Sequence, residues 1–184
     1  MGRIRDGHIW LTGFSGSGKS TVAPLLADRL GLRSYDLDRI IEREFSAPIV
    51  DVFRAKGEKA FREAESQIVR ELAGRRGPSV IALGGGVLED HRNRLAVRRS
   101  GTLVYLQCAQ RELYRRLRHL KDRPLLHGGA GEAVSARMVK DRIAGLLARR
   151  RVVYQQAEII VSTTKRQPEE VAAVVTEKLK KLHA

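Results

Sequence analysis

The sequence has few of the features that mark secreted or membrane-spanning proteins. Its 184 residues include one cysteine, Cys108, which can form neither an internal disulfide nor a multi-cysteine metal site. No stretch approaches the roughly 20 apolar residues that a membrane-spanning helix needs. The first residues also lack the apolar segment of a signal peptide. We therefore expect a cytoplasmic protein without a membrane partner.

Aromatic side chains are scarce, and acidic ones are outnumbered. The chain has one Trp, four Tyr and four Phe, and its 35 Lys and Arg against 21 Asp and Glu give a net charge of +14. A surplus of this size often indicates a nucleic-acid partner. Here, however, the arginines are spread through helical stretches without the interleaved aromatic residues of a base-stacking surface. We therefore do not expect a dedicated nucleic-acid interface.

The most specific pattern is GFSGSGKS at residues 13–20, which matches the phosphate-binding loop G-x-x-x-x-G-K-[ST] at each fixed position. In such a loop the backbone N–H groups point at phosphate oxygens, Lys19 reaches the β- and γ-phosphates, and the Ser20 hydroxyl ligates Mg²⁺. The alternative is a chance glycine-rich turn, but the apolar run before it and the helical pattern after it favour the loop. We predict bound ATP and Mg²⁺, held by Gly16, Ser17, Gly18, Lys19, Ser20 and Thr21.

Apolar runs bounded by turn signals recur along the whole chain, separated by stretches of helical periodicity. They lie at 8–12, 32–35, 79–83, 102–106 and 158–161. Strands that alternate with helices indicate an α/β fold with a parallel sheet covered on both faces. The length suits one domain.

Two aspartates follow the second of these strands. Asp36 and Asp38 would lie at the carboxyl edge of the sheet, where open α/β folds bind ligands. The strands at 79–83 and 102–106 run into Gly84 and Gln107 rather than an aspartate, so Asp36 is the best candidate for a second Mg²⁺ ligand. Asp38 can then accept a hydrogen bond from an acceptor hydroxyl. Asp38 also suits a helix N-cap, and both roles can coexist.

Three further segments have a composition that suits a binding site. Gly84, Gly85 and Gly86 can bring backbone N–H groups close to a ligand, although they also suit a simple turn. A helical pattern between Gly57 and Gly74 places Arg62 and Glu65 beside each other. Residues 121–131 contain a proline and three glycines, as expected of a lid that closes over a ligand or of an ordinary connection.

Together these motifs resemble the shikimate kinase family. The resemblance runs nearly end to end, through 13–21, 36–38, 57–63, 84–87 and 123–126, and through Arg150 four residues before Tyr154. It implies a three-layer α/β/α P-loop fold with a five-stranded parallel sheet, like nucleoside monophosphate kinases. It also implies ATP-dependent phosphorylation of the 3-hydroxyl of shikimate by a monomer. Residues 1–184 would form a single kinase domain, with an acceptor-binding region at about 36–65 and a lid at about 117–131.

The resemblance also implies residue roles. Asp38 would bind the reacting hydroxyl, and Arg62 and Arg150 would clasp the shikimate carboxylate. Arg123 would join Lys19 and Asp38 as a catalytic residue by neutralising phosphate charge, and Arg116 would stack on the adenine. Further contacts would come from Gly84, Gly85, Gly86, Phe53, Phe61 and Glu65 on the acceptor side and from Gln167 in the adenine loop.

Two departures from the family pattern leave alternatives open. The family's Arg-x-Pro-Leu-Tyr is Arg150-Arg151-Val152-Val153-Tyr154 here, so Arg149 or Arg151 competes with Arg150. The family's adenine loop commonly begins with an aspartate, and Ser162 stands there in this chain. Arg115 also competes with Arg116 for the place on the adenine. The alternative functions are a related kinase acting on an aminoshikimate or gluconate, and a non-catalytic module that senses shikimate.

Overall fold

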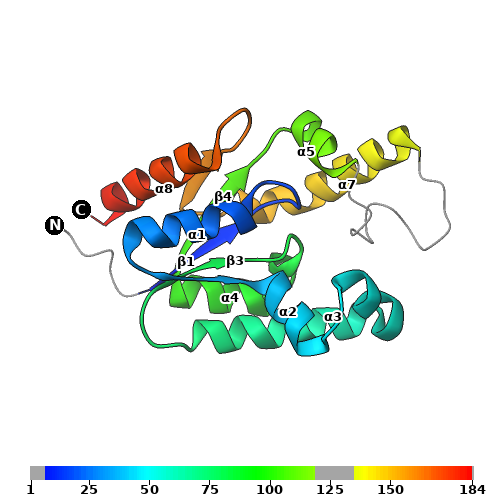
Figure 1. Ribbon diagram of the computed structural model, residues 1–184, viewed down its shortest axis with the longest axis horizontal. Coiled ribbons are helices and arrows are strands. Elements are labelled where there is room, and N and C mark those ends of the chain that lie inside the picture. Colours follow the sequence, from blue (N-terminus) through cyan, green and yellow to red (C-terminus); the bar gives the residue numbers. More distant parts are fainter. Residues whose placement is uncertain (1–6, 119–134, 184) are drawn as a thin grey trace.

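The structure is a computed structural model that describes residues 7–118 and 135–183. Strands and helices alternate along the chain (Figure 1). The elements are β1 (His8–Thr12), α1 (Lys19–Leu30), β2 (Arg33–Asp36), α2 (Leu37–Phe45), α3 (Ile49–Ala73), β3 (Ser79–Ala82), the 3₁₀ helix η1 (Val87–Glu89), α4 (His91–Ser100), β4 (Gly101–Gln107), α5 (Gln110–Leu117), α7 (Ala136–Tyr154), β5 (Ile159–Ser162) and α8 (Pro168–Leu182).

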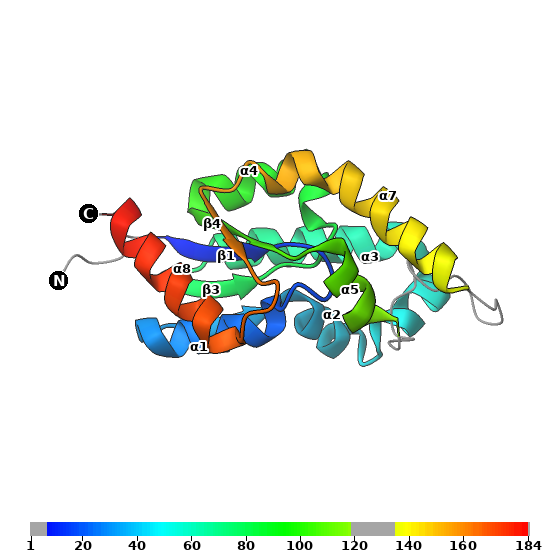
Figure 2. The ribbon, with the colours of Figure 1, turned by 90° about the horizontal axis from the view of Figure 1, so that it is seen from above.

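The five strands form one parallel sheet in the order β2-β3-β1-β4-β5. Helices α1 and α8 cover one face, and α3 and α4 cover the other (Figure 2). These observations confirm the predicted three-layer α/β/α fold. Each predicted strand is present, with bounds that differ by a residue or two.

Neighbouring side chains of β1 pack into opposite halves of the core. Ile9 and Leu11 pack with α1 and α8 on one face, while Trp10 points to the other face and packs with α3 and α4. All three side chains are fully buried. A strand whose three middle residues are all apolar therefore lies at the centre of the sheet, as expected for a parallel sheet covered on both faces.

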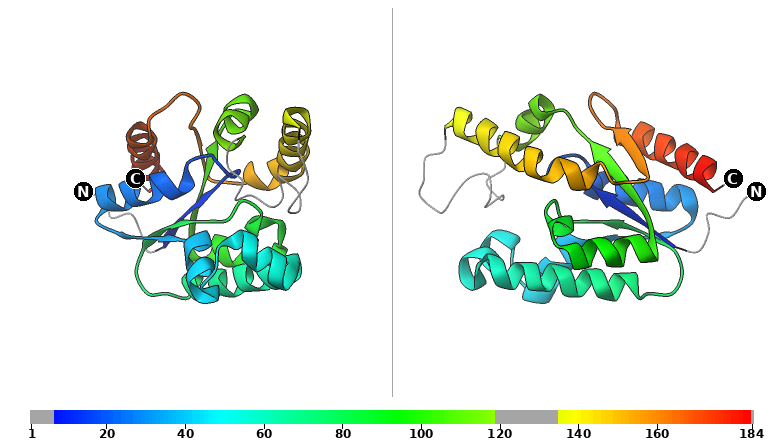
Figure 3. Two further views of the ribbon diagram at one scale, coloured as in Figure 1. Left: turned by 45° about the vertical axis from the view of Figure 1, so that its right-hand side comes forward. Right: turned by 180° about the vertical axis from the view of Figure 1, so that it is seen from behind.

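The central strand also sets where a ligand can bind. The chain leaves β1 for β2 on one side, and β4 later pairs with β1 on the other side. Residues 13–18, which follow β1, therefore lie at the point where the strand order reverses, the usual ligand site of open α/β sheets. Beyond the carboxyl end of β4, α5 packs against α7 (Figure 3).

Helix α3 consists of two helical segments separated by a kink at Gly57, whose φ of 78° and ψ of 169° are not helical. The second segment is the helix expected between Gly57 and Gly74, and the first segment, which begins at Ile49, was not predicted. Glycine adopts this conformation readily. The resulting kink brings Phe53, before it, against Phe61, after it, with ring centroids 4.5 Å apart.

Within the described residues, none of the helices has the length and apolar character needed to cross a membrane.

The pairing of β1 with β4 depends on the absence of a side chain at Gly101, which lies opposite His8. A Cβ at Gly101 would lie 1.9 Å from the His8 carbonyl oxygen, which is backbone and cannot rotate away. We expect Gly101→Ala to lower the free energy of unfolding by about 3 kcal/mol or more, measured by urea denaturation.

Gly145→Ala is the matched control. Gly145 lies inside α7, and a Cβ there has no atom within 4 Å, so this change should raise stability by about 0.5–1 kcal/mol. Similar effects of the two substitutions would contradict the tight β1–β4 approach.

Candidate active site

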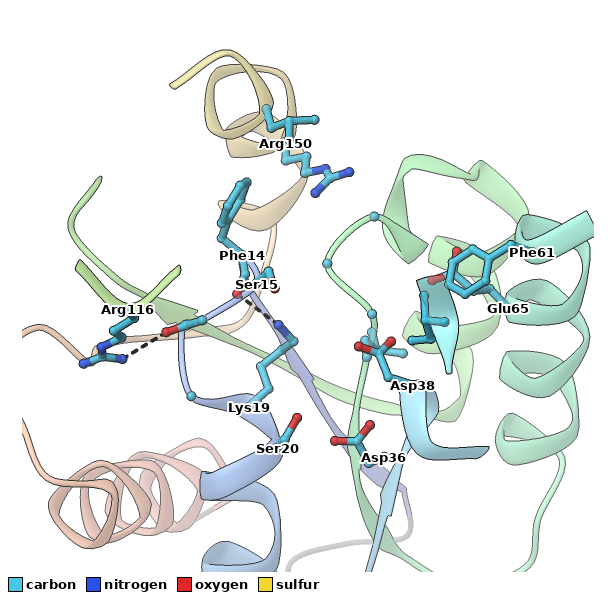
Figure 4. A pocket seen from close by; sticks show the side chains of 18 of the residues that line it. Phe14, Ser15, Lys19, Ser20, Asp36, Asp38, Phe61, Glu65, Arg116 and Arg150 are labelled. Atoms are coloured by element: carbon cyan, nitrogen blue, oxygen red, sulfur yellow. Dashed lines mark hydrogen bonds between the residues drawn. The ribbon is translucent and has the colours of Figure 1, made fainter. Parts of the chain in front are cut away.

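A cavity of about 340 Å³ lies at the carboxyl edge of the sheet (Figure 4). One side is formed by the phosphate-binding loop and the start of α1, and the other by α3, α7 and the glycines after β3. Asp36 and Asp38 reach it from the end of β2 and the start of α2. The cavity thus collects most of the site residues that the sequence indicated.

The loop after β1 has the backbone of a phosphate cradle. Gly13, Gly16 and Gly18 have φ values of 146°, 78° and 100°, a region that residues with a Cβ rarely adopt. Lys19 is buried, and its Nζ donates to the carbonyls of Gly13 at 2.8 Å and Phe14 at 3.1 Å. The ammonium is therefore held at the cradle before any ligand arrives.

One hydroxyl of this loop fits an anionic ligand. Ser15 lines the cavity, and its buried Oγ makes no hydrogen bond with the described residues. Buried polar atoms normally have a partner, so a missing one points to a bound group or water, and a phosphate oxygen could accept a hydrogen bond from this hydroxyl. The Ser17 Oγ is also without a partner, but Ser17 is fully buried and does not line the cavity.

Ser20 and Asp36 face the same space from α1 and β2 (Figure 4). Asp36 also caps α2, because its Oδ1 accepts the Arg39 N–H at 3.2 Å. The N-cap role considered for Asp38 therefore belongs to Asp36. A carboxylate can accept several interactions, so the cap leaves capacity for a metal ion.

In the described part of the chain, no group of three or more His, Cys, Asp or Glu could hold a metal. This fits Mg²⁺, which is commonly held by one or two protein ligands together with substrate phosphates.

Arg116 bridges two loops at the donor end of the cavity. Its guanidinium donates to the Gly16 carbonyl at 3.0 Å and to the Thr163 carbonyl at 3.3 Å. Hydrogen bonds from Arg115 and Arg116 lower the pKa of Glu112 to about 2, so this carboxylate stays charged and holds both arginines. Arg116 lines the cavity, whereas Arg115 is exposed and does not.

Gln167 lies outside the cavity lining. It is the N-cap of α8, and it forms a capping box with Glu170. The structure therefore gives Gln167 a local role at the start of that helix.

The acceptor end of the cavity is built around the glycines after β3. A Cβ at Gly84 would lie 2.5 Å from Oε1 of Glu65 and 3.2 Å from Oδ1 of Asp38, so both carboxylates approach this backbone. A Cβ at Gly86 would lie 2.9 Å from Nη1 of Arg62 and 3.0 Å from Nη2 of Arg150. The two guanidinium groups therefore flank the same point.

Each of these arginines has its own acidic partner. Arg62 donates to Glu65 at 2.5 Å and to the exposed Glu58 at 3.2 Å. Arg150 donates from Nε to Glu89 at 2.7 Å and lies over the ring of Phe14. The arrangement leaves guanidinium N–H groups for a ligand carboxylate.

The register of the last arginine motif is unambiguous. Arg150 is 5% exposed and lines the cavity, while Arg149 and Arg151 are exposed and do not line it. One helical turn later, the Tyr154 hydroxyl donates to the Gly85 carbonyl at 2.5 Å. Helix α7 is therefore fixed directly to the glycine segment.

An apolar wall completes the acceptor end. Ile49, Phe53 and Phe61 from α3 and Leu146 from α7 line the cavity. The Arg62 guanidinium lies over the Phe61 ring at 5.4 Å from its centroid. A ligand with an apolar ring face and a carboxylate would match both surfaces.

Glu65 has an unusual electrostatic environment. Burial raises the pKa of its carboxyl to about 7 against the attraction of Arg62, and the negative charge of Asp38 raises it further. The side chain is 1% exposed.

Several residues of the site were not predicted from the sequence. Glu89 and Glu112 hold the arginines, while Phe14, Ile49 and Leu146 add apolar surface. Glu112 stands four residues before Arg116, a spacing that could have indicated it. No local pattern connects Glu89 with Arg150. Arg123 and residues 119–131 of the expected lid lie outside the described residues.

Comparisons with known proteins agree on one family. A family model described as shikimate kinase matches residues 15–180. A shikimate kinase of Chlorobium chlorochromatii is 50% identical over 155 residues, which is 84% of this chain and 81% of the relative. The shikimate kinase of Acinetobacter baumannii, solved in complex with shikimate, has a TM-score of 0.87 and 30% identity, covering 96% of this chain and 94% of that one.

A gluconokinase of Sinorhizobium meliloti shares the fold more distantly. Its TM-score is 0.58 at 20% identity, with 97% of this chain and 94% of that chain covered.

The raised pKa of Glu65 predicts a pH-dependent stability. The folded state keeps a proton on Glu65 between about pH 4.5 and 7, where the unfolded state has lost it, so stability falls as the pH rises through this window. We expect Glu65→Gln to remove about 2 kcal/mol of this decline, measured by urea denaturation from pH 4.5 to 7.5.

Glu63→Gln serves as the control, because Glu63 is exposed on the same helix. It should keep the wild-type pH dependence. Equal slopes for wild type and Glu65→Gln would contradict the assignment.

Proposed function

The chain belongs to the shikimate kinase family, whose reaction is the ATP- and Mg²⁺-dependent phosphorylation of shikimate, and we propose which of its residues carry out that reaction. The observation that carries the proposal is the convergence of Arg62 and Arg150 at Gly86, in a cavity that is also lined by Asp38, beside Gly84, and by the phosphate-binding loop. An acceptor anchored by its carboxylate would thus present a hydroxyl toward the donor.

The arginine pair anchors the acceptor. Two guanidinium groups that flank one point can both donate to a carboxylate, and a planar guanidinium matches carboxylate geometry better than a lysine does. Glu65 holds Arg62 in place. Phe53 and Phe61 bound the apolar face of the ring, while Gly84, Gly85 and Gly86 allow its close approach.

Asp38 orients the reacting hydroxyl. It sits in the first turn of α2, next to Gly84 and the buried Glu65. From there its carboxylate can accept a hydrogen bond from the acceptor hydroxyl and align it for in-line attack. In phosphoryl transfer, positioning and charge stabilisation supply most of the rate enhancement.

The donor side binds the phosphates of ATP. The N–H groups of residues 13–21, Ser17 among them, and the hydroxyl of Ser15 would hold phosphate oxygens, and Lys19 would neutralise the transferring group. Mg²⁺, held by Ser20 and Asp36, would offset phosphate charge when bound. Arg116 would border the adenine, Gln167 would contribute from the start of α8, and Arg123 would add positive charge from the lid.

The proposal also covers the oligomeric state, the cellular compartment and the division of the chain into regions. The proposal takes a monomer as the active form. The dependence on ATP fits the cytoplasm as the place of action. The division into a donor core, an acceptor region at 36–65 and a lid at 117–131 is part of the same proposal.

Among the alternative functions, a kinase for an aminoshikimate is the nearest, because such an acceptor carries the same carboxylate and a similar ring. Gluconate also has a carboxylate, but it has no ring to pack against Phe53 and Phe61. A sensing module would bind shikimate without releasing ADP.

A coupled assay for ADP release tests the proposed function. Shikimate should give the highest kcat/KM among an equal series of shikimate, an aminoshikimate, quinate, gluconate and nucleoside monophosphates. Shikimate binding without ADP release would support the sensing module instead, and a higher kcat/KM for another acceptor would overturn shikimate as the substrate.

Asp38→Asn tests the orienting carboxylate. Because the amide is a weaker acceptor for the hydroxyl proton, we expect kcat to fall by about 100-fold or more while the KM for shikimate changes by less than about fivefold. Asp51→Asn, an exposed aspartate on α3, is the control and should retain wild-type kcat. Turnover near the wild-type value in Asp38→Asn would reject the role.

A further inference from the structure

The ion pair between Arg150 and Glu89 connects two elements that are 61 residues apart in sequence. Arg150 lies on α7, and Glu89 is the last residue of η1, three positions after Gly86. Glu89 Oε1 accepts Nε–H of Arg150 at 2.7 Å. The Arg150 side chain is 6% exposed and that of Glu89 is 43% exposed, so the arginine is the buried member of the pair.

The contact uses one particular edge of the guanidinium. The Nε–H group points to Glu89, while Nη1 and Nη2 lie nearest to Gly85 and Gly86. A guanidinium can donate two parallel hydrogen bonds to a carboxylate from its two terminal nitrogens. With Nε occupied, these terminal nitrogens are the ones presented at the acceptor end of the cavity.

Two further contacts hold the Arg150 guanidinium. It lies over the ring of Phe14 and makes a hydrogen bond with the Tyr154 hydroxyl. Neither of these groups is a carboxylate, so Glu89 supplies the negative charge that this buried arginine contacts. Such a partner offsets part of the cost of burying the positive charge.

The backbone around Glu89 has anchors of its own. The Glu89 N–H donates to the Gly86 carbonyl at 2.9 Å, and Arg94 donates to the carbonyls of Leu88 and Glu89 at 2.7 and 3.0 Å. Tyr154 holds Gly85. The position of the glycine segment therefore does not depend on the Glu89 carboxylate, whose action is directed at Arg150.

We propose that Glu89 is a positioning residue of the acceptor site, which orients the terminal nitrogens of Arg150 toward the acceptor carboxylate. The proposal rests on the role of Arg150 in the proposed function. It adds a residue outside the motifs that identify the family, and one that does not itself line the acceptor cavity. The arginine pair is thus preorganised by two separate acidic partners, Glu65 for Arg62 and Glu89 for Arg150.

The test compares steady-state kinetics of wild type, Glu89→Ala and Glu89→Gln. We expect Glu89→Ala to raise the KM for shikimate about tenfold, with kcat within about twofold and the KM for ATP unchanged. Glu89→Gln should show a smaller increase, since the amide oxygen still accepts from Nε. An unchanged or lower KM for shikimate in Glu89→Ala would overturn the proposal, and so would an equal rise in both KM values.

Asp141→Ala is the matched control, because it removes the carboxylate of an exposed ion pair with Arg137 on the same helix. It should leave both KM values unchanged. Thermal unfolding of each variant shows whether the protein is folded, and a purely structural Glu89 would lower Tm without changing the KM for shikimate.

A second measurement addresses the carboxylate of the acceptor directly. A shikimate analogue with a carboxamide in place of the carboxylate should bind wild type more weakly than shikimate does. In Glu89→Ala the same replacement should have a smaller effect, because the two changes disrupt one interaction. Additive effects would overturn the proposal. Failure of wild type to phosphorylate shikimate would instead reject the proposed function, so the two failures are distinguishable.

Discussion

A charged group that leaves water needs a partner, and this requirement organises the carboxyl edge of the sheet. Lys19, Glu65 and Arg150 are each less than a tenth exposed. Lys19 is paired with the carbonyls of its own loop, Glu65 with Arg62, and Arg150 with Glu89. Each pairing also fixes the orientation of the charged side chain. The contacts that neutralise the buried charges therefore also prepare the binding site.

The division between donor and acceptor ends explains why the fold alone does not define the substrate. The cradle for phosphate follows from β1, its glycines and the start of α1, and a gluconokinase shares the fold that builds it. The acceptor end depends on a few side chains from α2, α3 and α7 that meet at Gly84 and Gly86. Substrate identity therefore rests on long-range contacts rather than on the sheet.

These two ends also differ in how far they could be predicted from the sequence. The phosphate-binding loop, the strands and the Arg62–Glu65 pair are local patterns, and the structure has each of them. Gly57 was taken as a helix boundary and does interrupt the helix, but the helical segment from Ile49 to Gly57 was not predicted. The Glu89–Arg150 pair was not predicted because only tertiary packing brings the two residues together. A cap on α2 was considered at Asp38 and lies at Asp36, because helix boundaries read from sequence are uncertain by a residue or two.

The bare backbone at Gly84 and Gly86 has a consequence for inhibition and resistance. A compound that packs against this segment contacts atoms that every amino acid shares, and a mutation could exclude it there only by adding a side chain. A Cβ at Gly84 would meet Glu65 and Asp38, and one at Gly86 would meet Arg62 and Arg150. Escape mutations at either position would therefore impair the cell's own use of the pocket, which makes this segment a durable target surface.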